Sequence, residues 1–133
     1  MEINLSNKIA IGTAQFGMEY GISNKNGQIK QNEVRNILNF ARSNNIDTID
    51  TAKVYESSEE TIGNYIKDYP DEYLKIITKV NKKGGSLEAQ IYDSIDKLKT
   101  SPVTVLAHSA ADYLDPVFCK ELHQLKNIKE IQQ

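Results

Sequence analysis

Four side chains in this sequence are of the types that, brought together, could protonate a carbonyl oxygen while a hydride arrives from another molecule. They are Asp50, Tyr55, Lys79 and His108. A tyrosine hydroxyl has a reference pKa of about 10, which is too high for easy proton exchange at neutral pH. A nearby ammonium stabilises the phenolate and lowers that pKa, and a carboxylate can hold the ammonium in place. An imidazole can donate a hydrogen bond to the carbonyl oxygen and orient the substrate.

Each of these side chains, taken singly, also has an ordinary structural explanation. Asp50 could cap the turn that follows it, and Lys79 could begin a solvated, lysine-rich loop. His108 could be a hydrogen-bonded structural residue, and Tyr55 could be one more half-buried aromatic side chain. The catalytic interpretation therefore depends on the elements that must bring the four residues together.

Short β-rich runs alternate with amphipathic helical patterns four times along the chain. The runs cover residues 9–13, 46–50, 74–79 and 103–108, and they end at Thr13, Asp50, Lys79 and His108. This alternation predicts parallel strands joined by right-handed crossovers, and hence an α/β fold. The runs are nearly all apolar, which is typical of strands buried on both faces. Because ligands bind at the carboxyl ends of parallel strands, we expect the polar ends to form one rim.

The helices that follow these strands carry start signals in the sequence. Ser, Asp and Asn side chains cap helix N-termini, and a Ser followed three residues later by Glu can form a capping box. Pro is favoured in the first turn. The expected starts are Asn32, Ser57 paired with Glu60, Ser86, and Asp115 followed by Pro116.

The chain has the size of a single domain, residues 1–133, with no linker or break in composition. Four βα repeats suit either a small open sheet or the first half of a (β/α)8 barrel, which typically needs about 250 residues. Residues 128–133 lie where a fifth strand would begin, which indicates a truncated barrel. A half-barrel would expose sheet edges and an apolar face, so self-association or a partner is expected there.

Composition excludes several classes of protein. The net charge is −2 with both signs interspersed, so no basic patch indicates nucleic-acid binding. No signal peptide is present, and no apolar stretch approaches the roughly 18 residues needed to span a membrane. Cys119 stands alone, and no cluster of His, Cys and carboxylates has metal-ligand spacing. These features favour a soluble cytoplasmic protein without a metal.

Around the four candidate residues, the sequence resembles the aldo-keto reductases, (β/α)8 barrels that reduce aldehydes and ketones with NADPH. Residues 50–63 match the family's pattern of Asp-Thr-Ala, Tyr, Ser-Glu and Ile/Leu-Gly. Residues 78–80 look like its strand-three lysine motif, residues 105–108 like its strand-four histidine motif, and residues 11–17 like its first-strand Gly-Thr segment.

The resemblance implies a role for each site residue. Tyr55 would be the general acid, Lys79 its pKa-lowering partner, and Asp50 the anchor of the lysine. His108 would orient the carbonyl group of a small-molecule substrate. The residues that would contact NADPH are Gly12, Thr13 and Asp50. The family binds the rest of the cofactor with later strands and loops that this sequence lacks, so we expect the chain alone to bind NADPH weakly.

Two departures from the family pattern affect this interpretation. The family usually has Gly directly after the tyrosine, where this chain has Glu56, and a carboxylate there could disfavour the phenolate. The family's common Pro shortly after the histidine is absent from residues 108–112, so a divergent bacterial branch is closer.

The sequence leaves three functional hypotheses open. The first is a carbonyl reductase that is active only when another chain or a continuation supplies the second half of the barrel. The second is a non-catalytic fragment that keeps the site residues without using them. The third is a binding module that retains a reductase-like fold for protein contacts. In this fold, loops largely set substrate specificity, and they include loops that this sequence lacks.

Overall fold

The computed structural model describes residues 8–71 and 73–125 of the chain. Its centre is a four-stranded parallel sheet in the order β1-β2-β3-β4, so each strand pairs with the next one in the sequence. The strands are β1 (Ala10–Gly12), β2 (Thr48–Asp50), β3 (Lys75–Val80) and β4 (Thr104–Ala107). The predicted parallel α/β arrangement is confirmed, and residues 128–133, where a fifth strand was expected, lie outside the described residues.

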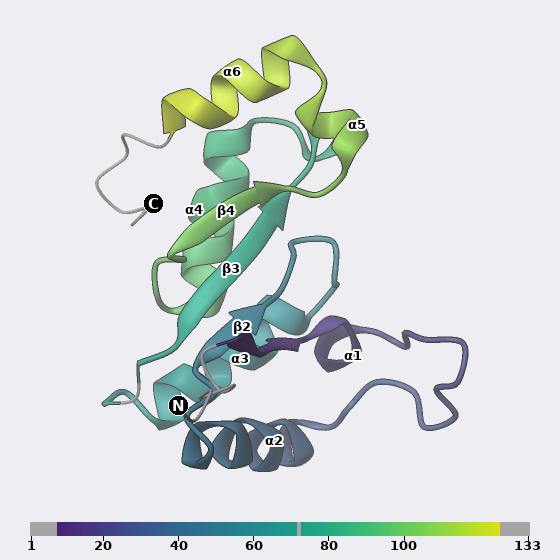
Figure 1. The fold of residues 1–133 in the computed structure, drawn as a ribbon, viewed down its shortest axis with the longest axis vertical. Helices are drawn as coiled ribbons and strands as arrows, with labels where there is room; N and C mark the ends of the chain where they lie inside the picture. Colours follow the sequence, from purple (N-terminus) through teal and green to yellow (C-terminus); the bar gives the residue numbers. More distant parts are fainter. Residues whose placement is uncertain (1–7, 72, 126–133) are drawn as a thin grey trace, which may run out of the picture.

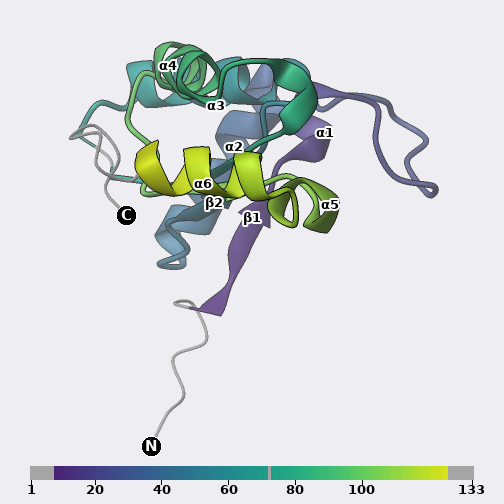
Figure 2. The same cartoon turned by 90° about the horizontal axis from the view of Figure 1, so that it is seen from above.

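Helices connect the strands and cover part of the sheet. They are α1 (Ala14–Gly17), α2 (Gln31–Ser43), α3 (Ser58–Asp68), the 3-10 turn η2 (Lys82–Gly84), α4 (Leu87–Leu98), α5 (Ala110–Tyr113) and α6 (Pro116–Leu125). In Figure 1, α2 and α6 lie at opposite ends of the long axis, with the strands between them. The connection between α1 and α2 extends away from the rest of the fold, and Figure 2 shows the same from above.

Two of the predicted helix caps are confirmed. The Ser86 hydroxyl accepts a hydrogen bond from the Ala89 amide at 3.3 Å. The Asp115 carboxylate accepts from the amides of Val117 and Phe118 at 3.1 and 2.9 Å. Both caps use only groups within three residues, so local sequence is enough to specify them.

Of the other two predicted helix starts, Asn32 is wrong, whereas Ser57 is at the N-cap position of α3 without the expected capping bond. Helix α2 begins at Gln31, one residue before Asn32, because the Gln31 side chain donates to the Thr61 carbonyl at 3.1 Å and fixes the first turn against α3. Ser57 precedes α3 but makes no capping bond. Its hydroxyl instead donates to the Gly17 carbonyl at 3.1 Å. At Ser57, a partner far away in the sequence takes the hydroxyl that local capping would use.

The sheet is buried on one face only, which corrects the prediction of strands buried on both faces. Along β3, Ile76, Thr78 and Val80 are buried, whereas Ile77 and Lys79 between them are partly exposed. Successive side chains of a strand point to opposite faces, so one face packs on helices and the other is partly open. The reason is that the helices of this four-stranded unit cover only one side.

The covered side holds two hydrophobic clusters. The larger joins β2 and the start of β3 to helices α1, α2, α3 and the end of α4, and β1 adds the partly buried Ile11. It consists of Phe16, Val34, Leu38, Ile49, Ile62, Tyr65, Leu74, Ile76 and Leu98. The smaller joins the end of β3 to α4 and α6, and consists of Val80, Leu87, Ile91 and Phe118. Burial of these side chains fixes the helices on the sheet and leaves the strand ends accessible.

Candidate active site

The strand register places three of the four predicted residues on the same face of the sheet. Asp50 pairs with Ile77, which is two residues before Lys79. Lys79 pairs with Leu106, which is two residues before His108. Because side chains alternate with a period of two, a two-residue offset keeps Asp50, Lys79 and His108 on one face. This is the half-exposed face, at the carboxyl ends of the strands.

Lys79 is held by two oxygen atoms at this rim. Its ammonium lies 2.5 Å from the Asp50 carboxylate and donates to the Thr51 carbonyl at 2.8 Å. The lysine side chain is 15% exposed and that of Asp50 is 36% exposed, so water reaches the pair mainly from the aspartate side. The predicted pairing of lysine and aspartate is therefore present in the structure.

Tyr55 lies beside this ion pair, in the connection between β2 and α3. The Lys79 ammonium is 5.3 Å from the centroid of the Tyr55 ring, within the range in which a cation is attracted to an aromatic face. Two backbone hydrogen bonds fix the turn, from the Tyr55 amide to the Ala52 carbonyl and from the Ser58 amide to the Tyr55 carbonyl. The side chain is partly exposed, so a substrate could reach it.

His108 completes the cluster from the edge strand. Its ring centroid is 6.2 Å from that of Tyr55, with an edge-on angle of 78° between the rings. The His108 amide donates to the Val80 carbonyl at 2.8 Å, which continues the β3–β4 ladder past the end of β4. The structure thus gathers Asp50, Tyr55, Lys79 and His108 within one rim.

Gly12 and Thr13, the other predicted cofactor residues, differ in accessibility. Gly12 is exposed, and nothing lies within 4 Å of the place where a Cβ would be. Thr13 is fully buried, and both its amide and its hydroxyl donate to the Asp50 carbonyl, at 3.0 and 2.9 Å. Gly12 therefore presents open backbone at the rim, whereas the Thr13 side chain ties the end of β1 to the end of β2.

Ser58, at the start of α3, was not singled out from the sequence. Its buried hydroxyl donates to the Thr13 carbonyl at 2.9 Å and lies 3.1 Å from the Thr51 hydroxyl. This hydroxyl therefore connects the start of α3, directly after the turn that carries Tyr55, to the chain just beyond the ends of β1 and β2. The signal in the sequence was a run of Ser and Glu at residues 57–60, but the side chain that reaches the strands is identified only by the fold.

Gly17 is a second residue whose role appears only in three dimensions. A Cβ at this position would lie 1.8 Å from the Tyr55 carbonyl oxygen and 2.3 Å from the Ser58 amide nitrogen. Only glycine allows α1 to approach the tyrosine turn so closely. Gln28 adds to this contact, because its side chain donates to the Phe16 carbonyl and to the Ser57 hydroxyl, both at 2.9 Å.

Glu56, the departure directly after the tyrosine, adopts a left-handed backbone with φ of 48°. This region of φ favours glycine, since a side chain there meets its own backbone. In this chain, therefore, the backbone at Glu56 has a conformation that glycine would adopt more easily. The Glu56 side chain itself is exposed.

Ion pairs around the rim shift several pKa values. The Lys53 ammonium, helped by Lys97, holds the pKa of Asp93 below its usual value, and so ties the tyrosine connection to α4. On the histidine side, Lys82 and the amides of the capped helix lower the pKa of Asp115. These carboxylates stay charged at neutral pH and fix the loops that border the site.

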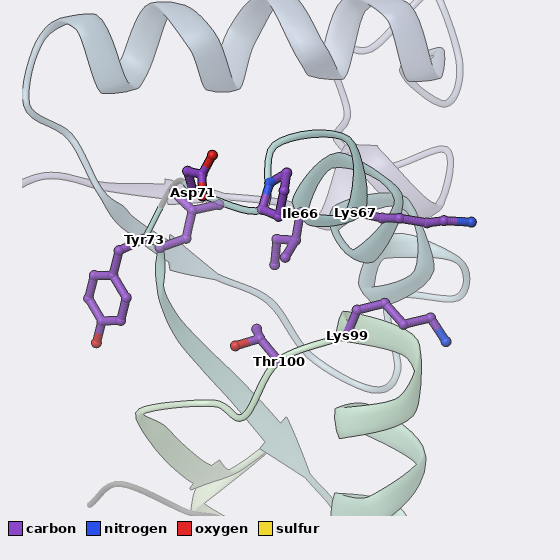
Figure 3. Close-up of a pocket in the computed structure, with 8 residues that line it drawn as sticks. Ile66, Lys67, Asp71, Tyr73, Lys99 and Thr100 are labelled. Atoms are coloured by element: carbon purple, nitrogen blue, oxygen red, sulfur yellow. The ribbon is translucent and has the colours of Figure 1, made fainter.

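A cavity of about 640 Å³ lies elsewhere in the molecule. It is bordered by the end of α3, the start of β3 and the residues after α4, and it is lined by Ile66, Lys67, Pro70, Asp71, Tyr73, Leu74, Lys99 and Thr100. Figure 3 shows the side chains of Lys67 and Lys99 extending away from the hollow. None of the four candidate catalytic residues lines it, because it is at the opposite end of the strands.

A family model of the aldo/keto reductases matches residues 8–132. The chain belongs to the aldo/keto reductase family. Two solved structures from Pseudomonas aeruginosa, each titled a putative aldo-keto reductase, share its fold with TM-scores of 0.72 and 0.71 at 24% and 22% sequence identity. Comparison with curated protein sequences gives no match.

The structural alignments cover nearly all of this chain but only part of each solved chain. Each alignment includes 92% of this chain but only 52% and 51% of the solved chains, so the chain spans about half of their length. The four parallel strands correspond to part of the (β/α)8 barrel of the aldo/keto reductases. The resemblance inferred from the sequence motifs is confirmed. Among the described residues, no helix is both long and apolar enough to cross a membrane.

Proposed function

We propose that this chain carries the proton-transfer residues of an aldo-keto reductase, in which Tyr55 is the general acid in the NADPH-dependent reduction of an aldehyde or ketone. The observation that supports this most directly is the contact of Asp50, Lys79 and Tyr55 at the exposed strand ends. A lysine that only solvated a loop would not be held by a carboxylate and a carbonyl beside a tyrosine ring. Family membership adds independent support.

In the proposed reaction, the Tyr55 hydroxyl gives its proton to the carbonyl oxygen as negative charge develops there. The phenolate that remains is stabilised by the Lys79 ammonium, whose position is fixed by Asp50 and the Thr51 carbonyl. His108, whose ring centroid is 6.2 Å from that of Tyr55, would donate to the same oxygen and orient it. Solvent returns the proton to Tyr55 after the alcohol leaves.

The described residues fit one side of a nicotinamide site. Gly12 leaves open space above its backbone and is in register with Asp50, whose side chain is partly exposed. We assign cofactor contact to these two residues, and we assign Thr13 the task of joining their strands. When bound, reduced nicotinamide supplies the hydride in this family. The contacts to the rest of the nucleotide would come from barrel strands outside this sequence, in a longer polypeptide or in an associated subunit.

The test is a titration of the purified chain with NADPH and, separately, with NADH, followed by nucleotide fluorescence and by carbonyl reduction. We expect the chain alone to bind weakly. Saturable binding, together with turnover that is lost in Tyr55→Phe, would support the proposal and would indicate that assembly supplies the remaining contacts. Tyr92→Phe is the matched control, because it removes the same hydroxyl from an exposed position on α4. If the folded chain binds neither nucleotide, whether as a monomer or as an oligomer, the result favours the alternative hypothesis that the chain keeps the fold without catalysing the reaction.

A further inference from the structure

Glu59 is a fully buried carboxylate close to the site, and the proposed reaction does not use it. The residue is 1% exposed. Its two oxygens accept hydrogen bonds from the Thr78 hydroxyl at 2.7 Å and from the Ser94 hydroxyl at 3.1 Å. None of the ion pairs between described residues includes it. Burying a carboxylate without a paired cation is costly, so a purely structural position would normally hold an apolar residue.

The helix start does not explain this burial. Negative side chains are favoured in the first turn of a helix, but the next residue, Glu60, meets that preference from the surface. Glu59 and Glu60 have the same side chain and the same helix turn. The difference is that Glu59 reaches inward to β3 and α4. The pKa of Lys97 does not distinguish the two, because it is raised mainly by the bond to Asp93 and further by the charges of both Glu59 and Glu60.

The partner on β3 connects Glu59 to the site. Thr78 directly precedes Lys79, and the alternation of the strand points Thr78 to the helices and Lys79 to the rim. On the other side, Glu59 follows Ser58, whose hydroxyl bonds to Thr13 and lies beside Thr51. The two consecutive buried residues therefore fix the start of α3 to the ends of β1, β2 and β3. Tyr55 lies in the short connection that ends at this fixed point.

We propose that Glu59 is a positioning residue, which sets the separation between Tyr55 and the Lys79 ammonium through its bond to Thr78. The catalytic meaning of this inference rests on the proposed function. The geometry that it describes, the separation of Tyr55 and Lys79, can be measured without turnover. A small displacement of reacting groups reduces enzymatic rates by up to about 100-fold, so a buried carboxylate that fixes this separation has a catalytic reason to be kept.

The primary test follows the Tyr55 ring by NMR in chains labelled with 13C at tyrosine, with Tyr55→Phe used to assign the signal. Thr78→Val removes the hydroxyl without changing the shape of the side chain, and Glu59→Gln removes the charge while keeping one accepting oxygen. We expect both variants to shift the Tyr55 ring signals, Thr78→Val more than Glu59→Gln, while the Tyr92 signals stay in place. Glu60→Gln is the matched control and should shift neither the Tyr55 signals nor the Tyr92 signals.

The outcomes separate positioning from a structural role and from the proposed function. If Thr78→Val and Glu59→Gln lower the melting temperature but leave the Tyr55 signals unchanged, Glu59 only stabilises the fold and the proposal is overturned. Where turnover is measured, Thr78→Val should lower kcat by about 10- to 100-fold with KM nearly unchanged. If turnover proves insensitive to Tyr55→Phe, the proposed function fails, while the ring signals still decide whether Glu59 positions Tyr55.

Discussion

The two sides of the candidate site are built differently. On the tyrosine side, Lys79 is held by Asp50 and by a backbone carbonyl, and the connection carrying Tyr55 ends in the buried residues Ser58 and Glu59. On the histidine side, His108 is exposed and lies just after the edge strand β4. Its described contacts are a backbone hydrogen bond to Val80 and the edge of the Tyr55 ring.

This difference indicates which part of the site is complete within the described residues. Lys79 is on the inner strand β3, with a neighbouring strand on each side, and Tyr55 lies in a connection that ends at the buried start of α3. His108 has a neighbouring strand on one side only, so a further strand or subunit beside β4 would decide its final environment. The expected order of mutational effects on stability follows from this contrast, with changes at buried residues of the tyrosine side costing the most.

Gly17→Ala should have the largest effect. The added Cβ would lie 1.8 Å from the Tyr55 carbonyl oxygen, so the tyrosine turn must move away from α1. We expect the free energy of unfolding to fall by about 3 kcal/mol, measured by urea denaturation. Gly12→Ala is the control, because nothing lies within 4 Å of its Cβ position. Equal losses for the two variants would contradict the close packing of α1 on this turn.

Ser58→Ala should come next. Removing the buried hydroxyl leaves the Thr13 carbonyl without this donor, and we expect a loss of about 2 kcal/mol in the free energy of unfolding. The comparison on the histidine side is Ser109→Ala, which removes an exposed cap of α5 and should cost about 0.5 to 1 kcal/mol. If the Ser109 variant is the less stable of the two, the contrast between the two sides is wrong.

Asp93→Asn should have a smaller and pH-dependent effect. Bonds from Lys53 and then Lys97 lower the pKa of Asp93 in the folded chain. Such a carboxyl stabilises the fold above its unfolded pKa, and this contribution is lost as the pH falls through the lower folded pKa. Because the group is partly exposed, we expect a loss of only about 0.5 kcal/mol at pH 7. Thermal melts should show the difference between the chains at pH 7 and none at strongly acidic pH.

His108→Ala should have the smallest effect on stability. The side chain is exposed and the backbone bond to Val80 is kept, so the free energy of unfolding should change by less than about 0.5 kcal/mol. Chemical denaturation measures this directly. A loss above 2 kcal/mol would show that the histidine side is as firmly built as the tyrosine side, and would remove the reason to expect a covering strand there.

Predictions from the sequence succeeded where the deciding contacts are close along the chain. Ser86 and Asp115 cap their helices with amides within three residues, and the four strands lie where apolar runs were expected. Helix α2 begins at Gln31 rather than after Asn32, and Gln31 bonds to Thr61, 30 residues away. Ser57 is at the N-cap position as predicted, but its hydroxyl bonds to Gly17, 40 residues away, instead of capping α3. Patterns of neighbouring residue types do not predict hydrogen bonds to residues so far away in the sequence.

The sequence by itself determined the order of the elements, the parallel sheet and the placement of Asp50, Lys79 and His108 at its carboxyl edge, because apolar periodicity and strand order follow from local residue types. The tertiary structure alone decided that the strands are open on one face, that Gly17 must lack a side chain, and that Ser58 and Glu59 hold the tyrosine turn. Those features depend on how close two distant segments approach, and that distance is set by packing across the whole sheet rather than by any single stretch of the chain.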